Sequence, residues 1–217
     1  MEHRMISIAD QIFDELEHDI LIGKYARGEL LTETRLSELL GVSRTPIREA
    51  LRRLEAEHII ENTSKGAKVI GLSREDIADI CEIRLRLEGL ASRWAAERAD
   101  DEGLRQLKSA VDLQEFYTQK NDAENLKNAD TSFHQCIYAL CGSTSIRDTL
   151  EPLHRKLQKY RRVSFTSPER ALCSLKEHRA IYEAIAGRLC DEAESLTVDH
   201  VRNAYAAIMA RDESADA

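Results

Sequence analysis

The chain lacks several features that would assign it to common classes of protein. Its 217 residues contain no apolar run long enough to span a bilayer, and no secretory signal opens the sequence. Five cysteines form no Cys-x-x-Cys pair, and their odd number favours free buried thiols over disulfides, with a thiol sensor as the minor alternative. Internal repeats and low-complexity tracts are also absent. We therefore expect a cytoplasmic globular protein of one large or two modest domains.

The charge balance restricts how the chain can bind nucleic acid. It contains 31 lysines and arginines against 39 aspartates and glutamates, a formal net charge of -8. An acidic protein does not attract nucleic acid as a whole, so any DNA contact must come from a local basic patch.

Residues 39–54 supply such a patch and read as a helix end, a tight turn and a second helix. Gly41 suits a helix stop, because glycine adopts a left-handed conformation without steric cost. Ser43 suits a helix start, because its hydroxyl can accept a backbone N–H, and Pro46 lies in the first turn, where a missing donor matters least.

The second of these helices has two distinct faces. Apolar residues recur at three- and four-residue spacing and form one buried stripe: Ile47, Leu51 and Leu54. Arginines follow at four-residue spacing on another face: Arg44, Arg48 and Arg52. An apolar back with an arginine front suits the DNA major groove, although a solvated charged face would look the same in isolation.

The flanking segments complete a winged helix-turn-helix pattern. Ser7 and Asp10 predict the start of a first helix, with Ile8, Ile12, Leu16 and Ile20 on its inner face. A loop is expected over 24–31, then a helix capped by Thr32 with Leu36, Leu39 and Leu40 facing inward. Two β-prone runs, 59–62 and 67–70, surround a polar turn and predict a hairpin with Lys65 and Lys68 near its tip.

A boundary is expected at residues 71–73, after which the β signals vanish. Helical patterns follow over 74–98, 102–119, 121–141, 145–162, 168–187 and 191–212, and Pro152 should kink or split the fourth. Short links between long amphipathic helices predict an antiparallel bundle. The fold class is mainly α, with a winged domain at 1–72 and an all-helical domain at 73–217.

One carboxylate and three imidazoles on three of these helices could converge on a divalent cation. Asp130 and His134 lie four residues apart on one helix face, and His178 and His200 have apolar neighbours on two later helices. This donor set suits a transition metal better than calcium. Buried histidines are more often hydrogen-bonded core residues, so spacing alone leaves both alternatives open. The other histidines, His154 among them, have no comparable setting and are expected to be surface or satisfied residues.

Arg84 and Glu88 are also four residues apart. They predict either an ordinary helical salt bridge or an arginine held by its partner and aimed at an anionic ligand. Arg161 and Arg162 are further candidates for gripping a carboxylate.

Together these segments resemble the GntR family of bacterial transcription regulators, in its FadR-like subgroup. Residues 41–54 match the family signature almost unbroken, and residues 28–31 and Gly66 also fit. The second half resembles the helical ligand-binding domain called FCD. One departure is His58-Ile59, where members commonly carry glycine, which puts the entry into the wing in doubt.

The resemblance and the residue patterns described above together predict roles for individual residues. We predict a DNA-contacting set of Arg35, Ser43, Arg44, Thr45, Arg48, Lys65 and Gly66. The implied metal set is Asp130, His134, His178 and His200, holding a divalent transition metal, zinc or nickel. The effector-binding set is Arg84, Glu88 and Arg161.

The function predicted from these sets is a homodimeric repressor of a catabolic operon. It would bind a palindromic operator and respond to a small anionic metabolite, a carboxylate or sugar acid bound at the metal. A regulator for which the cation itself is the signal is the first alternative. A metal-dependent hydrolase would leave the DNA half unexplained, and a pure scaffold would need neither the arginine face nor the inward histidines. We expect no enzymatic activity and no membrane association.

Overall fold

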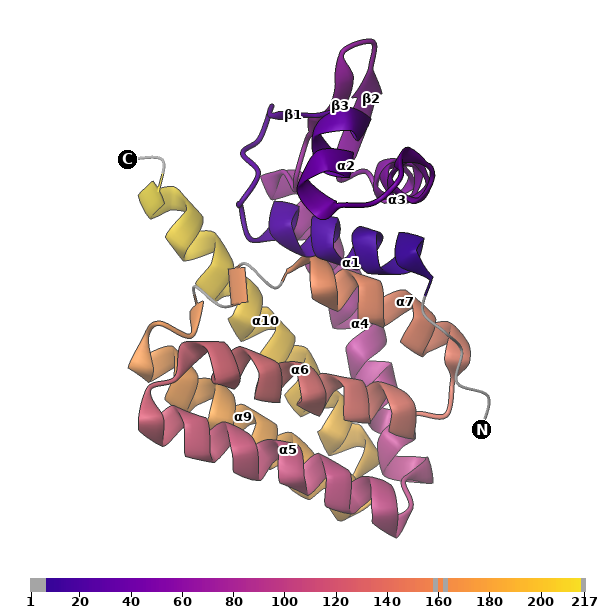
Figure 1. The fold of residues 1–217 in the computed structure, drawn as a ribbon. Coiled ribbons are helices and arrows are strands. Elements are labelled where there is room, and N and C mark those ends of the chain that lie inside the picture. Colours follow the sequence, from indigo (N-terminus) through magenta and orange to yellow (C-terminus); the bar gives the residue numbers. More distant parts are fainter. Residues whose placement is uncertain (1–6, 158–159, 162–163, 216–217) are drawn as a thin grey trace. The chain divides into compact units, whose positions relative to one another are not determined.

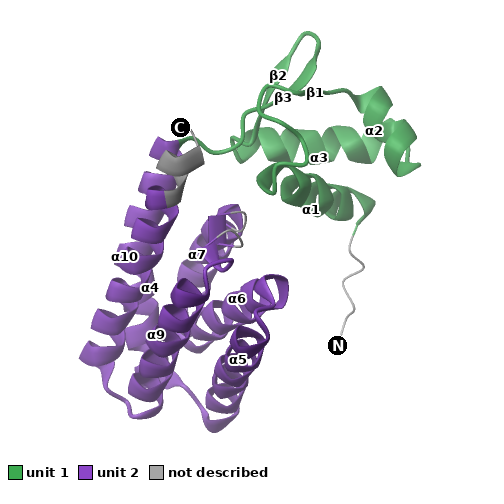
Figure 2. Cartoon of the chain, turned by 90° about the vertical axis from the view of Figure 1, so that its left-hand side faces the viewer, with its two compact units in different colours: residues 1–73 green, residues 74–217 purple. Residues whose placement is uncertain are grey.

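The computed structural model of the chain describes residues 7–157, 160–161 and 164–215 (Figure 1). It divides into two compact units, residues 1–73 and residues 74–217 (Figure 2). The architecture is a small winged helix-turn-helix unit followed by an all-helical unit, as the sequence patterns predict.

The N-terminal unit combines three helices with a small sheet. Its elements are α1 (Ile8–Leu21), β1 (Leu30–Leu31), α2 (Glu33–Leu40), α3 (Arg44–Ala56), β2 (Ile60–Thr63) and β3 (Gly66–Val69). The strands are antiparallel in the order β1-β3-β2, with Thr63 opposite Gly66 at the hairpin turn and Leu31 opposite Ala67. The hairpin is confirmed, but β1 lies inside the expected loop over 24–31. Two residues carry no strand periodicity, and only their pairing with β3 makes them a strand.

Local capping signals set most of these helix ends. Ser7 and Asp10 form a capping box at α1, and the Thr32 side chain accepts a hydrogen bond from the Arg35 amide at α2. Gly41 ends α2 in the left-handed conformation, with φ of 66°. The prediction for Ser43 is wrong in one respect: it occupies the N-cap position of α3, but its hydroxyl makes no capping hydrogen bond.

The core of this unit is built from one face of each helix and the inner side of the sheet. Ile47 and Leu54 of α3 are fully buried. Two expected core positions are wrong, because the side chains of Ile8 and Leu39 are 56% and 60% exposed. Ile8 opens the first turn of α1, and the eight-residue α2 buries only Leu36, so neither helix contacts the core along its whole apolar stripe.

His58 marks a backbone position that favours glycine. It follows the α3 C-cap with φ of 57°, and the Ile59 amide then bonds back to the Leu54 carbonyl. At a helix end, every residue except glycine pays a steric cost for the left-handed conformation, because its Cβ is crowded. His58 therefore takes the strained conformation itself, and the chain still enters β2 normally.

The described residues of the second unit form helices and the short connections between them. Its elements are α4 (Arg74–Arg98), α5 (Asp101–Lys120), α6 (Ala123–Leu140), α7 (Thr144–Lys156), α9 (Pro168–Ala186) and α10 (Cys190–Ala215). Helix α10 packs on α4 and α9, and α5 packs on α6 and α9 (Figure 1). Pro152 lies inside α7 and does not split it, but α7 ends at Lys156, earlier than the expected 162. Among the described residues, no helix combines the length and apolarity that a bilayer crossing requires.

The cysteines only partly match the expected free buried thiols. All five are free, and Cys81 and Cys141 are buried, but Cys173 is exposed and the prediction is wrong there. Burial raises the pKa of Cys81 to about 11, which keeps its thiol protonated and unreactive.

Candidate functional site

The arginine face of α3 lies at the surface of the N-terminal unit. Arg44, Arg48 and Arg52 are all exposed, while the apolar stripe of the same helix is buried. The Nε and Nη2 atoms of Arg48 both donate to the Glu33 carboxylate at 2.7 Å. Three N–H groups of the guanidinium remain for a ligand, since arginine carries five and two donate to Glu33. The carboxylate thus holds Arg48 in one orientation at the surface.

The remaining residues of the predicted DNA-contacting set belong to the same unit. Arg35 is exposed and donates to Glu29 at 2.9 Å. Ser43, Thr45 and Lys65 are also exposed. Gly66 is required for a structural reason: its φ is 132°, and a Cβ there would lie 2.9 Å from the Leu31 carbonyl oxygen. Only glycine lets the wing approach β1 this closely.

The structure brings the predicted metal ligands together from three helices of the second unit. Asp130 and His134 come from α6, His178 from α9 and His200 from α10, and all four are at most 3% exposed. One ligand atom from each residue lies within 4.8 Å of the others. The His200 Nε2 atom is 3.2 Å from that of His178 and 3.3 Å from that of His134. The Asp130 Oδ1 atom lies 3.6 Å from His178 Nε2 and 4.0 Å from His134 Nε2.

The other ring nitrogen of each imidazole, Nδ1, lies next to a side chain from another helix. The pairs are His178 with Gln114 (2.6 Å), His200 with Glu177 (2.7 Å) and His134 with Glu88 (3.1 Å). In each pair the partner atom is an amide or carboxylate oxygen, which only accepts. The Nδ1 atoms of His178 and His200 make hydrogen bonds in these pairs and therefore carry the protons, so their Nε2 lone pairs face one another.

Facing lone pairs repel unless a cation lies between them, so the geometry fits a metal. Ligand atoms on one ion with bonds of about 2.0–2.1 Å are about 2.9–3.4 Å apart, as the His–His distances are. Burial and the neighbouring imidazoles lower the pKa of His178 well below its usual value. Burial also lowers the pKa of His200, to about 4, even though Glu177 opposes the shift. Neutral imidazoles are the form that binds a metal.

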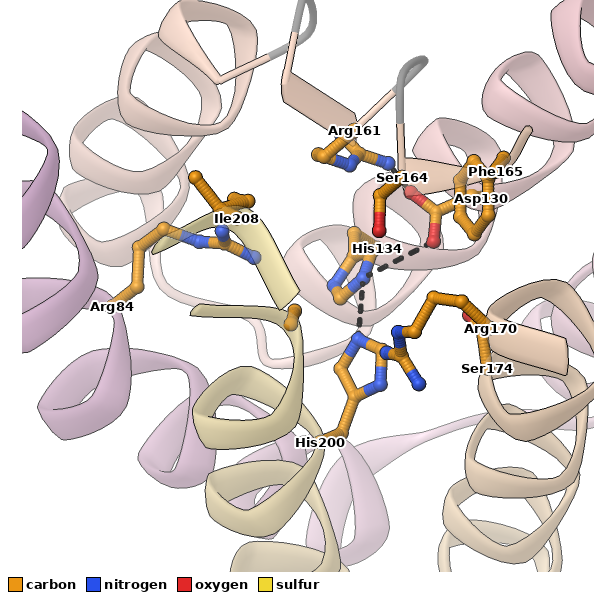
Figure 3. Close-up of a pocket in the computed structure, with 11 residues that line it drawn as sticks. Arg84, Asp130, His134, Arg161, Ser164, Phe165, Arg170, Ser174, His200 and Ile208 are labelled. Atoms are coloured by element: carbon orange, nitrogen blue, oxygen red, sulfur yellow. Dashed lines mark hydrogen bonds and ion pairs between the residues drawn. The ribbon is translucent and has the colours of Figure 1, made fainter. Parts of the chain in front are cut away.

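A pocket opens onto this cluster. It is small and is lined by Asp130, His134 and His200 together with Arg84, Arg161, Arg170, Ser164 and Ser174. In Figure 3 the three arginines approach the cluster from different sides. Three guanidinium groups and two hydroxyls beside a metal-type cluster suit an anion with several oxygen atoms.

Arg84 and Glu88 are a buried pair, not a surface salt bridge. Their side chains are 2% and 1% exposed, and Arg84 Nε donates to Glu88 Oε1 at 2.5 Å. The same oxygen accepts from the Tyr138 hydroxyl at 2.9 Å. Burial alone would raise the pKa of Glu88, but Arg84 and His134 hold it well below its usual value. Glu88 does not line the pocket. Its carboxylate holds Arg84 and supports His134.

Arg161 is buried at the pocket wall, where its guanidinium contacts Asp130 and His154. Arg162 lies outside the described residues. His154 is 2% exposed, with its ring 4.7 Å from that of His134, so the expectation that it has no setting comparable to the metal set is wrong. Glu88, His134 and His154 form a second group of potential metal ligands. Arg84 pairs with Glu88, the only carboxylate of this second group, and so disfavours a cation there.

Among the residues of the site that sequence reasoning missed are Arg170 and Glu177. Arg170 lines the pocket and donates twice to Glu177, at 3.0 and 2.9 Å. The two are seven residues apart on α9, which places them on one helix face two turns apart. That spacing was a usable signal for the pair, but not for its contact with His200 on α10.

Comparison with known proteins agrees with this arrangement. A model of bacterial regulatory proteins of the gntR family matches residues 8–70, and a model of the FCD domain matches residues 79–203. HTH-type transcriptional regulator YdhC of Bacillus subtilis (strain 168) is 28% identical over 193 residues, covering 88% of this chain and 86% of that protein. The galactonate operon transcriptional repressor of Escherichia coli (strain K12) is 28% identical over 219 residues, which cover 85% of this chain and 90% of that protein. The solved structure of E. coli McbR/YncC has a TM-score of 0.82 at 21% identity, covers 95% and 99% of the two chains, and supports the fold alone.

The fold and these matches define a winged helix-turn-helix transcription regulator with an all-helical second domain. The chain belongs to the GntR family of bacterial regulatory proteins, in the FadR-like group that carries an FCD domain.

Proposed function

We propose that this protein is a ligand-responsive repressor of a catabolic operon. It binds operator DNA through the winged unit and a small carboxylate or sugar acid in the helical unit. The observation that carries the proposal is the convergence of three pocket arginines on a buried cluster of one carboxylate and three imidazoles. The E. coli relative named above is a repressor of a galactonate operon, and galactonate is a sugar acid of this class.

The proposed metal is zinc or nickel, held by Asp130, His134, His178 and His200. When bound, such an ion supplies positive charge and an open position for a carboxylate oxygen. The chain's own residues orient the anion: Arg84 is fixed by Glu88 and Arg170 by Glu177. A metal-dependent hydrolase lacks support here, because the nearby carboxylates Glu88 and Glu177 are already engaged and neither is placed as a general base.

In the proposed DNA complex, a homodimer places one winged unit on each half of a palindromic operator. Arg44 and Arg48 contact bases, while Arg35 and Lys65 contact phosphates. The effector acts by biasing the dimer away from its DNA-competent state, which requires different affinities in the two states. The protein would act where the operator is, in the cytoplasm.

The DNA assignment is tested with a duplex that the wild-type protein selects from a random pool. Arg48→Ala should weaken operator binding about 5- to 150-fold in a gel-shift titration and relax selectivity at one base pair. Arg105→Ala, which removes an exposed arginine of α5 paired with Glu102, is the matched control and should bind normally. Binding should also weaken steeply with added salt. Unchanged affinity of Arg48→Ala would refute the assignment.

The effector assignment is tested by thermal melting of the zinc-loaded protein with galactonate and a panel of related sugar acids and dicarboxylates. A binding acid should raise the melting temperature and release the selected duplex. A chelator should abolish both responses. A response that survives chelation would remove the metal from the mechanism, and the absence of any response would remove the acid.

One alternative regulator function has its own support, a protein for which the cation is itself the signal. The four-residue cluster is buried and needs no organic ligand to complete it. In that case operator binding would follow the free zinc or nickel concentration with no acid present. Operator binding that is indifferent to the metal in the absence of acid would exclude this alternative.

A further inference from the structure

One side chain lies between each imidazole of the cluster and one polar group that lines the pocket. Glu88 lies against His134 through Oε2 and accepts from Arg84 through Oε1. Gln114 accepts from His178 through Oε1 and donates to the Ser174 hydroxyl at 3.2 Å through Nε2. Glu177 accepts from His200 through Oε2 and from Arg170 through both oxygens. The three connecting residues, Glu88, Gln114 and Glu177, come from three different helices, α4, α5 and α9.

We propose that these three connecting residues are positioning residues that couple the metal cluster to the anion pocket. The inference rests on the proposed function and adds the means by which the two halves of the site influence each other. A carboxylate or amide that holds a ligand histidine fixes its ring orientation and its basicity, and such partners contribute strongly to metal affinity. Here the same groups also fix the side chains that face the anion.

Glu177 is the connecting residue best suited to a test. Its carboxylate accepts four hydrogen bonds: one from His200, two from Arg170 and one from Asn203 Nδ2 at 3.0 Å. Its side chain is 19% exposed, whereas Glu88 and Gln114 are fully buried and their removal would disturb the core. Arg170 contacts Glu177 and neutralises part of its charge, so it weakens Glu177 as an acceptor for His200.

The coupling predicts that Arg170 affects metal affinity through Glu177. Without Arg170, the Glu177 carboxylate would accept more strongly from His200 Nδ1 and make Nε2 a better ligand. An anion that pairs with Arg170 in place of Glu177 should therefore strengthen metal binding. By linkage, the bound metal then strengthens anion binding by the same factor. Arg179 on the same helix is a matched control, because it pairs with Glu115 at 2.8 Å on the surface.

The experiment measures zinc affinity, with zinc alone, by competition against a chromophoric chelator. Glu177→Ala should weaken zinc binding about 10- to 100-fold, and Glu177→Gln should recover part of it, because its amide oxygen can still accept from His200. Arg170→Met should tighten zinc binding several-fold in the wild-type background and clearly less in the Glu177→Ala background, where only the direct repulsion between Arg170 and the cation is lost. Arg179→Met should change neither.

The outcomes separate this inference from the proposed function. The coupling is overturned, and the metal site left standing, if Glu177→Ala binds zinc as tightly as the wild type. An Arg170→Met effect of equal size in both backgrounds has the same meaning. Failure of the wild type to bind zinc or nickel overturns the metal and the coupling together. If Glu177→Ala does not fold, the Arg170→Met effect measured in the Glu177→Gln background, which should be smaller than in the wild type, decides the question.

Discussion

The two units each contain an arginine paired with a glutamate through Nε, and the pairs differ in burial. Arg48 and Glu33 of the winged unit have side chains 55% and 32% exposed, whereas Arg84 and Glu88 of the helical unit are 2% and 1% exposed. Water and salt screen the first pair, so its partners can be exchanged for DNA at little cost. The second pair is shielded and cannot open without leaving a buried charge.

This difference fits the two proposed kinds of recognition. A surface that binds and releases a polyanion gains from arginines that are oriented but weakly held. A pocket that distinguishes one small anion from another gains from arginines fixed in position before the ligand arrives. The same two residue types therefore serve opposite needs, and burial decides which.

The largest expected effect comes from breaking the buried pair. Glu88→Ala leaves the Arg84 charge buried without its partner and removes the support of His134. It should lower the free energy of unfolding by about 3–5 kcal/mol. Urea denaturation followed by Trp94 fluorescence measures it, because Trp94 is the only tryptophan and lies in α4.

The control for this prediction removes both partners. Arg84→Met combined with Glu88→Leu should recover most of the loss, since apolar side chains of similar volume can replace a buried pair. A double variant as unstable as Glu88→Ala would mean that packing around this position, rather than the unpaired charge, causes the loss.

An intermediate effect is expected at the wing, where the backbone of the N-terminal unit fits tightly. Gly66→Ala forces a Cβ to within 2.9 Å of the Leu31 carbonyl oxygen at φ of 132° and should cost about 1–3 kcal/mol. Hydrogen exchange of the β3 amides measures it. Gly71→Ala is the control: its φ is 64° but no atom lies within 4 Å of the added Cβ, so its cost should be smaller.

The smallest effect on stability is expected from breaking the exposed pair. Glu33→Ala should leave the melting temperature unchanged within error, because water replaces the lost partner. It should instead reduce the preference for the selected duplex over a scrambled one, since Arg48 loses the carboxylate that orients it. Gel shifts with both duplexes measure that preference. A large drop in melting temperature would show that the two Arg–Glu pairs do not differ as their burial suggests.

Much of the fold follows from short-range signals that the sequence displays. The capping box at Ser7, the left-handed Gly41 and the apolar stripe of α3 act within one or two turns of their own helix. The exposure of Leu39 and the strand at Leu30–Leu31 depend on how many neighbours the packed unit provides, and no local pattern reports that number.

The candidate site divides in the same way. The four residues of its cluster could be predicted because Asp130 and His134 share a helix face and His178 and His200 interrupt apolar helix faces. The burial of His154 and the identity of the connecting residues could not, since Gln114 and His178 are separated by 64 positions. Contacts at that separation arise only when α5, α6, α9 and α10 are packed together.

The sequence by itself determined the two-part architecture, the arginine-fronted helix and the donor residues, because each rests on periodicity and capping within a single element. Tertiary structure alone decided which arginines are exposed and which are buried, and which side chain supports each imidazole. Burial and long-range contacts are properties of the assembled core, and they set the strength of every charge in it.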